Sequence, residues 1–308
     1  MGGSGGGSSI PSLTLEELHA RAAAHTEQVR YEAELEDVLK DALREFNNRD
    51  VKVIHQHLDT IIDALSKNLD EGTLKLLFGG SVAKHTYVNG LSDVDMLACL
   101  NDTSLENFSP QQVLSHFEAQ LKGRLPRTEV KIGDLAVTVK FSNGHEIQIL
   151  PSIRTARGFR IVDPKTGGWS NVVAPHRFAA KLTTVNQNLG NSVVPVIKLA
   201  KAVNDALPKR LRLSGYHIES IAIEAFKSYS GRQTCREMTR HFWQVAQSQV
   251  MRPIADSTGQ SRHVDDYLGI SNSEARHRVS SAIGKIVSKI EQADNLRSTG
   301  IWQEMLEI

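Results

Sequence analysis

The stretch that most constrains this chain is residues 76–100, in which two apolar runs flank a polar connection. The first run ends at Gly79-Gly80-Ser81, and the second follows Asp93-Val94-Asp95. Short apolar runs bounded by glycine and polar residues are typical of buried strands. The stretch therefore predicts a strand, a tight turn, a short helix and a second strand.

The polar residues of this stretch point to metal and phosphate chemistry. Asp93 and Asp95 are two residues apart, so on a strand both carboxylates face the same way. Two such oxygen ligands suit Mg²⁺ or Mn²⁺ shared with substrate phosphates. Gly80 lets the backbone come close to a bulky anion, and Ser81 with the amides of the following helix start offers donors to phosphate. The alternative is an ordinary turn followed by two solvated acids.

The order of these residues resembles the signature of the DNA polymerase β-like nucleotidyltransferases. The longer string Gly-Ser-Val-Ala-Lys-His-Thr, with Ser-Asp-Val-Asp after it, is similar to the branch that contains oligoadenylate synthetase, cGAS and the bacterial CD-NTases. Lys84, Thr86 and Ser92 match that branch, whereas His85 stands where it usually has glycine. CD-NTases make cyclic oligonucleotide signals in anti-phage defence. The resemblance therefore implies the two-metal chemistry of polymerases, with Asp93 and Asp95 as catalytic metal ligands.

That chemistry also requires a third acidic residue on a neighbouring strand, to hold the catalytic metal and accept the proton of the attacking hydroxyl. In the resembled family it stands in the pattern acidic or polar residue, hydrophobe, Asp, two hydrophobes, Pro. Here the pattern reads Glu146-Ile147-Gln148-Ile149-Leu150-Pro151. Gln148 occupies the place of the aspartate, and its amide carries no charge and is no base.

Three explanations stay open. Glu146, two residues away on the same strand face, supplies the carboxylate as a catalytic residue. Alternatively, Asp93 and Asp95 work with substrate phosphate alone, or the protein binds nucleotides without turning them over. Asp134, in a turn between strands, is a further option. Gln148 is expected beside the bound nucleotide in each case.

A second motif lies in a predicted helix at residues 191–206, where Lys198 and Lys201 are three residues apart and share a face. Ser214-Gly215-Tyr216-His217 follows. The order resembles the family's Lys-x-x-Lys helix followed by Ser-Tyr-His. The resemblance implies that Lys201, with Lys198 nearby, reaches the triphosphate and that Tyr216 stacks on a base. Ser214, implied as a further phosphate ligand, lies one residue before the family's serine, whose place Gly215 takes.

Composition and charge limit the remaining possibilities. The 308 residues allow one large domain or two lobes, and 40% hydrophobic with 23% charged residues is a globular composition. A net charge of +1 argues against a protein that coats nucleic acid through bulk charge. Cys99 and Cys235 make no disulfide framework or zinc motif, which favours a reducing cytosol. No apolar run reaches the length of a membrane span, so no membrane partner is expected.

The pattern of elements predicts an α+β protein: a two-lobed polymerase β-like nucleotidyltransferase with a mixed β-sheet catalytic lobe and a helical lobe. Residues 1–9 are interpreted as an artificial linker, 10–174 as the catalytic lobe with N-terminal helices, and 175–308 as the helical nucleotide-binding lobe. Pro151 is expected to end the last strand, 153–171 to form a basic loop, and Asp265 and Asp266 to be acids at a helix start. Strands are expected at 74–78, 93–100, 129–132, 135–141 and 145–150, and helices at 14–46, 51–69, 111–122, 175–189, 191–206, 214–230, 232–249 and 273–292.

We therefore expect a cytoplasmic nucleotidyltransferase that joins nucleoside triphosphates into a cyclic or linear oligonucleotide second messenger. A ribose hydroxyl would attack the α-phosphate with the help of Mg²⁺ or Mn²⁺, and a downstream effector would read the product. One alternative is transfer of nucleotides to RNA, DNA or protein, although no strong nucleic-acid groove is indicated. The other is a nucleotide-binding pseudoenzyme that acts as a sensor.

Overall fold

The computed structural model describes residues 14–48, 51–66, 74–89, 91, 93–101, 103–163, 166–258 and 261–308. Its strands are β1 (Lys75–Phe78), β2 (Val94–Cys99), β3 (Glu129–Ile132), β4 (Val137–Lys140), β5 (Glu146–Thr155) and β6 (Gly158–Ile161). Its α-helices are α1 (Leu15–Asn47), α2 (Val51–Ser66), α3 (Gly80–Ala83), α4 (Pro110–Arg124), α5 (Pro175–Asn188), α6 (Val193–Asp205), α7 (Gly215–Phe226), α8 (Cys235–Gln249), α9 (Glu274–Leu296) and α10 (Thr299–Leu306). Three 3₁₀ turns are η1 (Ser104–Asn107), η2 (Lys209–Leu211) and η3 (Asp266–Leu268).

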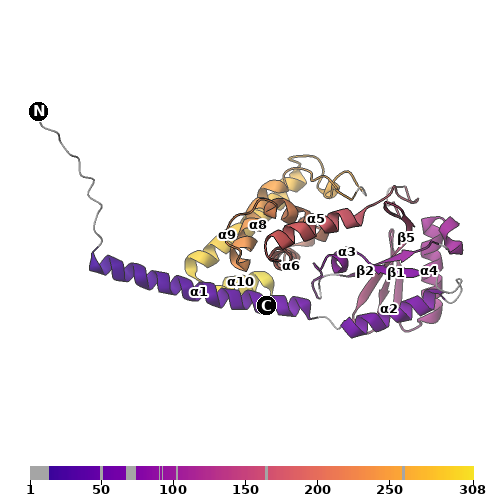
Figure 1. Ribbon diagram of the computed structural model, residues 1–308, viewed down its shortest axis with the longest axis horizontal. Coiled ribbons are helices and arrows are strands. Elements are labelled where there is room, and N and C mark those ends of the chain that lie inside the picture. Colours follow the sequence, from indigo (N-terminus) through magenta and orange to yellow (C-terminus); the bar gives the residue numbers. More distant parts are fainter. Residues whose placement is uncertain are drawn as a thin grey trace, which may run out of the picture.

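The strands form one mixed sheet in the order β1-β2-β5-β4-β3, with β6 added to the far part of β5. β2 and β5 are parallel, and the other pairs are antiparallel. Residues of α2 and α4 share a core with one face of this sheet (Figure 1). Val94 and Met96 of β2 are buried in that core, so Asp95 between them and Asp93 before them face the other side. The acidic pair thus lies on the side of the sheet away from α2 and α4.

A second core lies among the helices from α5 onward, and α1 belongs to it. Tyr31, Leu35, Leu39, Ala42 and Phe46 of α1 are buried in the cluster that also contains α6, α7, α8 and α9. In Figure 1, α1 runs along the helical part of the molecule toward the end that holds the sheet. The sequence analysis grouped this helix with the catalytic lobe, whereas its packing joins it to the helical one. Its apolar stripe alone cannot tell which surface it covers.

The structure corrects the predicted end of one strand. β5 continues through Pro151 to Thr155 instead of stopping at the proline. On one side Pro151 stays opposite Ala98 of β2. On its other side, pairing with β4 ends at Ile149 and pairing with β6 begins at Ser152. The missing N–H therefore falls where the strand changes partners, a position at which a ladder tolerates proline.

Two further elements differ from the predictions. The region expected to be a basic loop after Ile153 contains the end of β5 and all of β6, which pair as a hairpin around residues 156–157. Helix α10 was not predicted, although its Trp302 is fully buried and donates from Nε1 to Tyr31 Oη over 3.2 Å. None of the helices in the described ranges combines the length and the apolarity that a bilayer span needs.

Candidate active site

The turn between β1 and α3 is built around Asp95. Gly79 N donates to the backbone oxygen of Asp95 over 2.8 Å, and the backbone N–H of Ser81 bonds its carboxylate. Gly80 has φ +47°, and a Cβ placed there would lie 1.6 Å from Asp95 Oδ2. Only glycine therefore fits beside this carboxylate. The close approach at Gly80 is to the chain's own carboxylate, and the predicted approach to a bound anion stays a prediction.

Burial and a neighbouring carboxylate destabilise the charged form of each aspartate. Burial raises the pKa of Asp93, and the neighbouring Glu146 raises it further. Burial also raises the pKa of Asp95, with a further contribution from Asp93. Carboxylates that are partly buried and close to one another favour a cation between them. The chemistry of Asp93 and Asp95 is therefore compatible with a divalent ion, and their role as metal ligands stays a prediction.

Gln148 lies where the third carboxylate was sought. It is directly opposite Asp95 in the parallel β2–β5 pair, and its Nε2 donates to Asp93 Oδ2 over 2.5 Å. Glu146 lies two residues before Gln148 in β5, opposite Lys140 of β4, and its Oε1 accepts from Lys140 Nζ over 2.5 Å. Among the described residues, no group of three or more His, Cys, Asp or Glu side chains is placed to hold a metal ion.

A cleft of about 450 Å³ brings most of the predicted residues together between the sheet and the helical lobe. From the sheet side come Gly80, Ser81, Asp93, Asp95 and Gln148, and from the helical side Lys201 and Tyr216. Three predicted site residues are absent from the described lining of the cleft: Glu146, Lys198 and Ser214.

Lys198 and Ser214 contact other residues instead. Lys198 Nζ donates to Asn47 Oδ1 at the end of α1. Ser214 is the N-cap of α7 and accepts from His217 N over 3.2 Å. Gly215, which takes the place of the family's serine, does line the cleft, and a Cβ there would lie 3.5 Å from Lys201 Cε.

A buried charged cluster closes the cleft on the helical side. Glu219 of α7 is 1% exposed and accepts from Lys201 Nζ over 2.9 Å, from Lys84 Nζ and from Thr86 Oγ1. Burial works to raise the pKa of Glu219, but Lys201 and Lys84 outweigh it and hold that pKa below its usual range. The sequence analysis assigned Glu219 no role. Its signal was a charged residue inside the apolar run 218–223.

Tyr216 forms an aromatic wall of the cleft. Its ring meets Phe178 edge-on, with centroids 4.6 Å apart, and its hydroxyl donates to Asp256 Oδ1 over 2.7 Å. Burial and the bond to Asp256 raise the pKa of Tyr216. Asp256 also accepts from Thr258 N and Ser261 N, at 2.7 and 3.0 Å. The loop around Asp256 thus holds the ring of Tyr216 in place.

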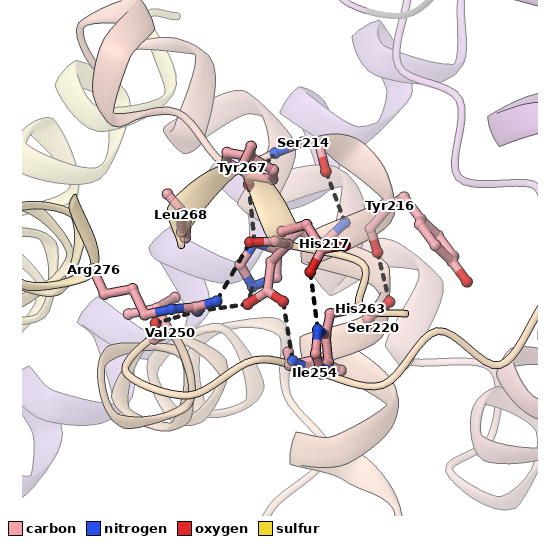
Figure 2. Close-up of polar contacts among 12 residues, drawn as sticks. Ser214, Tyr216, His217, Ser220, Val250, Ile254, His263, Tyr267, Leu268 and Arg276 are labelled. Atoms are coloured by element: carbon pink, nitrogen blue, oxygen red, sulfur yellow. Dashed lines mark hydrogen bonds and ion pairs between the residues drawn. The ribbon is translucent and has the colours of Figure 1, made fainter. Parts of the chain in front are cut away.

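A buried network of hydrogen bonds and an ion pair connects this loop to the helices next to it (Figure 2). Asp265 and Arg276 are fully buried and form an ion pair of 2.7 Å, and Asp265 Oδ1 accepts from Ile254 N. Both acids stand at the start of a helical turn as predicted, Asp265 as the N-cap residue of η3 and Asp266 as its first residue. Asp265 is in addition this buried counter-ion, a role that the sequence did not indicate. His217 Nε2 lies 3.6 Å from Asp265 Oδ2, and burial lowers the pKa of His217 to about 4.

His85, the departure from the family pattern, has a backbone φ of 60°. That left-handed conformation is the one glycine adopts without strain, which explains why glycine is usual there. The residue still allows the turn to bring Thr86 under the buried cluster, since Thr86 N donates to Ser81 O over 2.9 Å.

Residues 30–186 match the family described as the second messenger oligonucleotide or dinucleotide synthetase domain. The chain belongs to this family. No curated protein matches it by sequence. The family assignment confirms the resemblance to the CD-NTases on which the sequence analysis relied.

Solved structures with a similar fold include the following three bacterial proteins. The Vibrio cholerae di-nucleotide cyclase DncV, in complex with ATP and GTP, aligns with a TM-score of 0.62 over 96% of this chain and 90% of its own, at 13% identity. The Bradyrhizobium diazoefficiens CD-NTase CdnG with GTP aligns at 0.58 over 84% and 92%, at 13% identity. The Escherichia coli CdnC with ATP aligns at 0.55 over 92% and 98%, at 16% identity. The predicted two-lobed nucleotidyltransferase fold is confirmed.

Proposed function

We propose that this chain is a nucleotidyltransferase that joins nucleoside triphosphates into a cyclic or linear oligonucleotide second messenger. The observation that carries the proposal is that one cleft combines Asp93 and Asp95 with Lys84, Lys201 and Tyr216. The acids suit divalent cations, the ammonium groups suit phosphates, and the aromatic ring suits a base. The family's description as a messenger synthetase supports the same reaction.

The donor set fits Mg²⁺ or Mn²⁺. Asp93 and Asp95 offer hard oxygen ligands whose pKa values are raised by burial and by neighbouring acids, so their charged forms gain from a cation. These two residues would hold the metal together with substrate phosphate oxygens. When bound, the metal lowers the pKa of the attacking hydroxyl and offsets negative charge on the leaving group.

In the proposed reaction a ribose hydroxyl oxygen bonds to the α-phosphorus, and the bond from that phosphorus to the β-phosphate oxygen breaks, so that pyrophosphate leaves. Lys84 lies where it can bond the phosphate tail, Lys201 adds a positive charge to the same wall of the cleft, and Tyr216 can orient the base. Gln148 cannot accept the hydroxyl proton. Glu146, whose charge already acts on Asp93, or solvent is left to take it.

The proposed substrates are ATP and GTP, since the neighbours DncV, CdnG and CdnC are complexes with one or both of these nucleotides. We further propose a cytoplasmic role in anti-phage defence, in which an effector protein reads the product. These features rest on the resemblance to the CD-NTases.

The test is pyrophosphate release from each of the four nucleoside triphosphates with Mg²⁺ or Mn²⁺, followed by chromatography of the products. We expect an oligonucleotide from the wild-type chain and none from Asp93→Ala or Asp95→Ala. Glu129→Gln, an exposed acid on the same sheet, is the matched control and should retain activity. Turnover that survives both aspartate substitutions would contradict the proposal, and nucleotides found only on added RNA, DNA or protein would identify a different acceptor.

A nucleotide-binding sensor without catalysis is the second candidate, because Gln148 donates a hydrogen bond to Asp93 where a third acid is needed. Gln148→Asp separates the two. If the chain is an enzyme limited by this position, the substitution should raise turnover by about 100-fold, the lower end of the effect of a general base. Nucleotide binding with no pyrophosphate release from either form would favour the sensor. Glu146→Gln in the same assay tests Glu146, and unchanged turnover removes it from the mechanism.

A further inference from the structure

Glu219 joins the two lobes at the floor of the cleft. Its carboxylate, 1% exposed, is bonded by Lys84 and Thr86 from the segment after α3 and by Lys201 from α6. A carboxylate this deep in a protein is costly unless it is paired. Here it is paired twice, and both partners line the cleft in which the nucleotide is proposed to bind.

The two lysines are not equivalent. Lys201 is 8% exposed and its Nζ contacts three oxygens: Glu219 Oε1 and Thr86 O at 2.9 Å, and Thr86 Oγ1 at 3.3 Å. An ammonium group has three N–H bonds, so these contacts use them all. The side chain of Lys84 is 14% exposed, and its Nζ lies 5.3 and 5.6 Å from the ring centroids of Phe178 and Tyr216. Lys84 is therefore the more accessible of the two.

The charges that line the described part of the cleft do not favour a free triphosphate. Three basic side chains, Lys84, Lys201 and Arg212, face four acidic ones. Asp205 forms an ion pair with Arg212, and Asp93 and Asp95 are the proposed ligands of the divalent cation. Of the acids, Glu219 is the one that neutralises a lysine. A triphosphate without a metal ion thus meets a lining with more acid than base.

We propose that Glu219 is an internal counter-ion that withholds one lysine charge from the triphosphate, so that a divalent cation is needed for binding as well as for chemistry. The inference rests on the proposed function, since it places the phosphate tail in this cleft. When the triphosphate arrives, Lys84 exchanges Glu219 for phosphate. Lys201 keeps its bonds to Glu219 and Thr86. Glu219 is a positioning residue, because it acts on the nucleotide through the lysines.

The test uses inorganic tripolyphosphate as the probe, with affinity measured by calorimetry in EDTA and in Mg²⁺. The wild-type chain should bind it at least about tenfold more tightly with Mg²⁺. In EDTA, Glu219→Gln should bind about tenfold more tightly than the wild type, because a freed ammonium bonds phosphate through a charge-assisted contact. Lys84→Met should bind about tenfold more weakly. The double variant Lys84→Met/Glu219→Gln should return to the wild-type value.

If Glu219 has only a structural role, the affinities of the variants for tripolyphosphate follow a different order. If it only holds the lobes together, Glu219→Gln weakens binding in EDTA, and the double variant binds no better than Lys84→Met. Either result overturns the inference, as does a wild-type affinity that is weak or equal with and without Mg²⁺. Thermal unfolding of each variant shows whether it is folded. If Glu219→Gln does not fold, the test is the affinity of the double variant compared with that of Lys84→Met. The expected order with tripolyphosphate but no reaction of any nucleotide would refute the proposed function alone.

Discussion

The sheet side and the helical side of the cleft differ in how their buried carboxylates are compensated. On the sheet, Asp93 and Asp95 lie together without a cationic partner within hydrogen-bond reach among the described residues, and burial and like charge raise their pKa values. On the helical side, Glu219 has two lysine partners that hold its pKa below the usual range. On the sheet side a bound cation would balance the charge, whereas on the helical side the protein's own lysines balance it. We therefore expect substitutions on the sheet side to lower activity most, and substitutions on the helical side to change nucleotide affinity and protein stability.

The largest expected effect is on the sheet wall. Asp95→Asn keeps the shape of the side chain but removes the charge that would hold a divalent ion. We expect the rate of pyrophosphate release to fall by roughly 10³-fold, comparable to the loss of a principal electrostatic group in an active site. Steady-state kinetics of the variant and of Glu129→Gln would measure it. A fall of less than about tenfold would mean that Asp95 is not a metal ligand, and the contrast between the walls would disappear.

A large effect on stability is expected behind the helical wall. Asp265→Ala leaves the fully buried guanidinium of Arg276 with only carbonyl partners, such as Val250 O at 2.8 Å. Removing one partner of a buried ion pair costs about 3–5 kcal/mol. Urea unfolding should show this loss. Glu274→Gln, which removes an exposed pair with Arg278, is the control and should change stability by less than about 0.5 kcal/mol. Equal effects in the two variants would contradict the role of Asp265 as an anchor.

The aromatic face of the helical wall should act through affinity. Tyr216→Ala removes a stacking surface worth about 1–3 kcal/mol for a base, so KM should rise by about fivefold to 150-fold. Tyr216→Phe keeps the ring and loses only the hydrogen bond to Asp256. Its KM should stay close to that of the wild type. If both variants raise KM equally, the hydroxyl and its loop, and not the ring, determine binding.

The smallest effect is a pH dependence of the metal-free protein. A carboxyl whose pKa is raised on folding binds its proton more tightly in the folded state, so its contribution to stability is lost as the pH rises through that raised pKa. At pH 7.5 in EDTA, Asp95→Asn should therefore unfold at a slightly higher temperature than the wild type. The gain should shrink as the pH is lowered through the raised pKa toward the usual range of an aspartate. A gain that does not change with pH would show that repulsion is not its cause.

Much of the sheet wall could be predicted because its residues are close in sequence. Asp93 and Asp95 share a face through the two-residue repeat of a strand, and Gly80 and Ser81 begin the short helix α3 that lies between β1 and β2. Gln148 was found through the strand pattern of the resembled family, and the structure places it opposite Asp95 in the parallel β2–β5 pair. These placements follow from local rules of strand geometry.

The helical wall could be predicted only in part. Lys201 and Tyr216 lie in the cleft, but Lys198, three residues from Lys201, contacts the end of α1. A helix repeat shows that two residues share a face and not which neighbour covers it. Glu219 escaped notice because its lysine partners, Lys84 and Lys201, are 135 and 18 residues away.

By itself, the sequence determined the order of the elements around the acidic pair, the glycine beside it, and the absence of a third aspartate at Gln148. These depend on residues within a few positions of each other or on one strand pair, where backbone geometry leaves little choice. Only the tertiary structure decided which charges are compensated. Glu219 and Asp265 are buried beside cations that come from other elements, and burial against a distant partner cannot be read from local spacing.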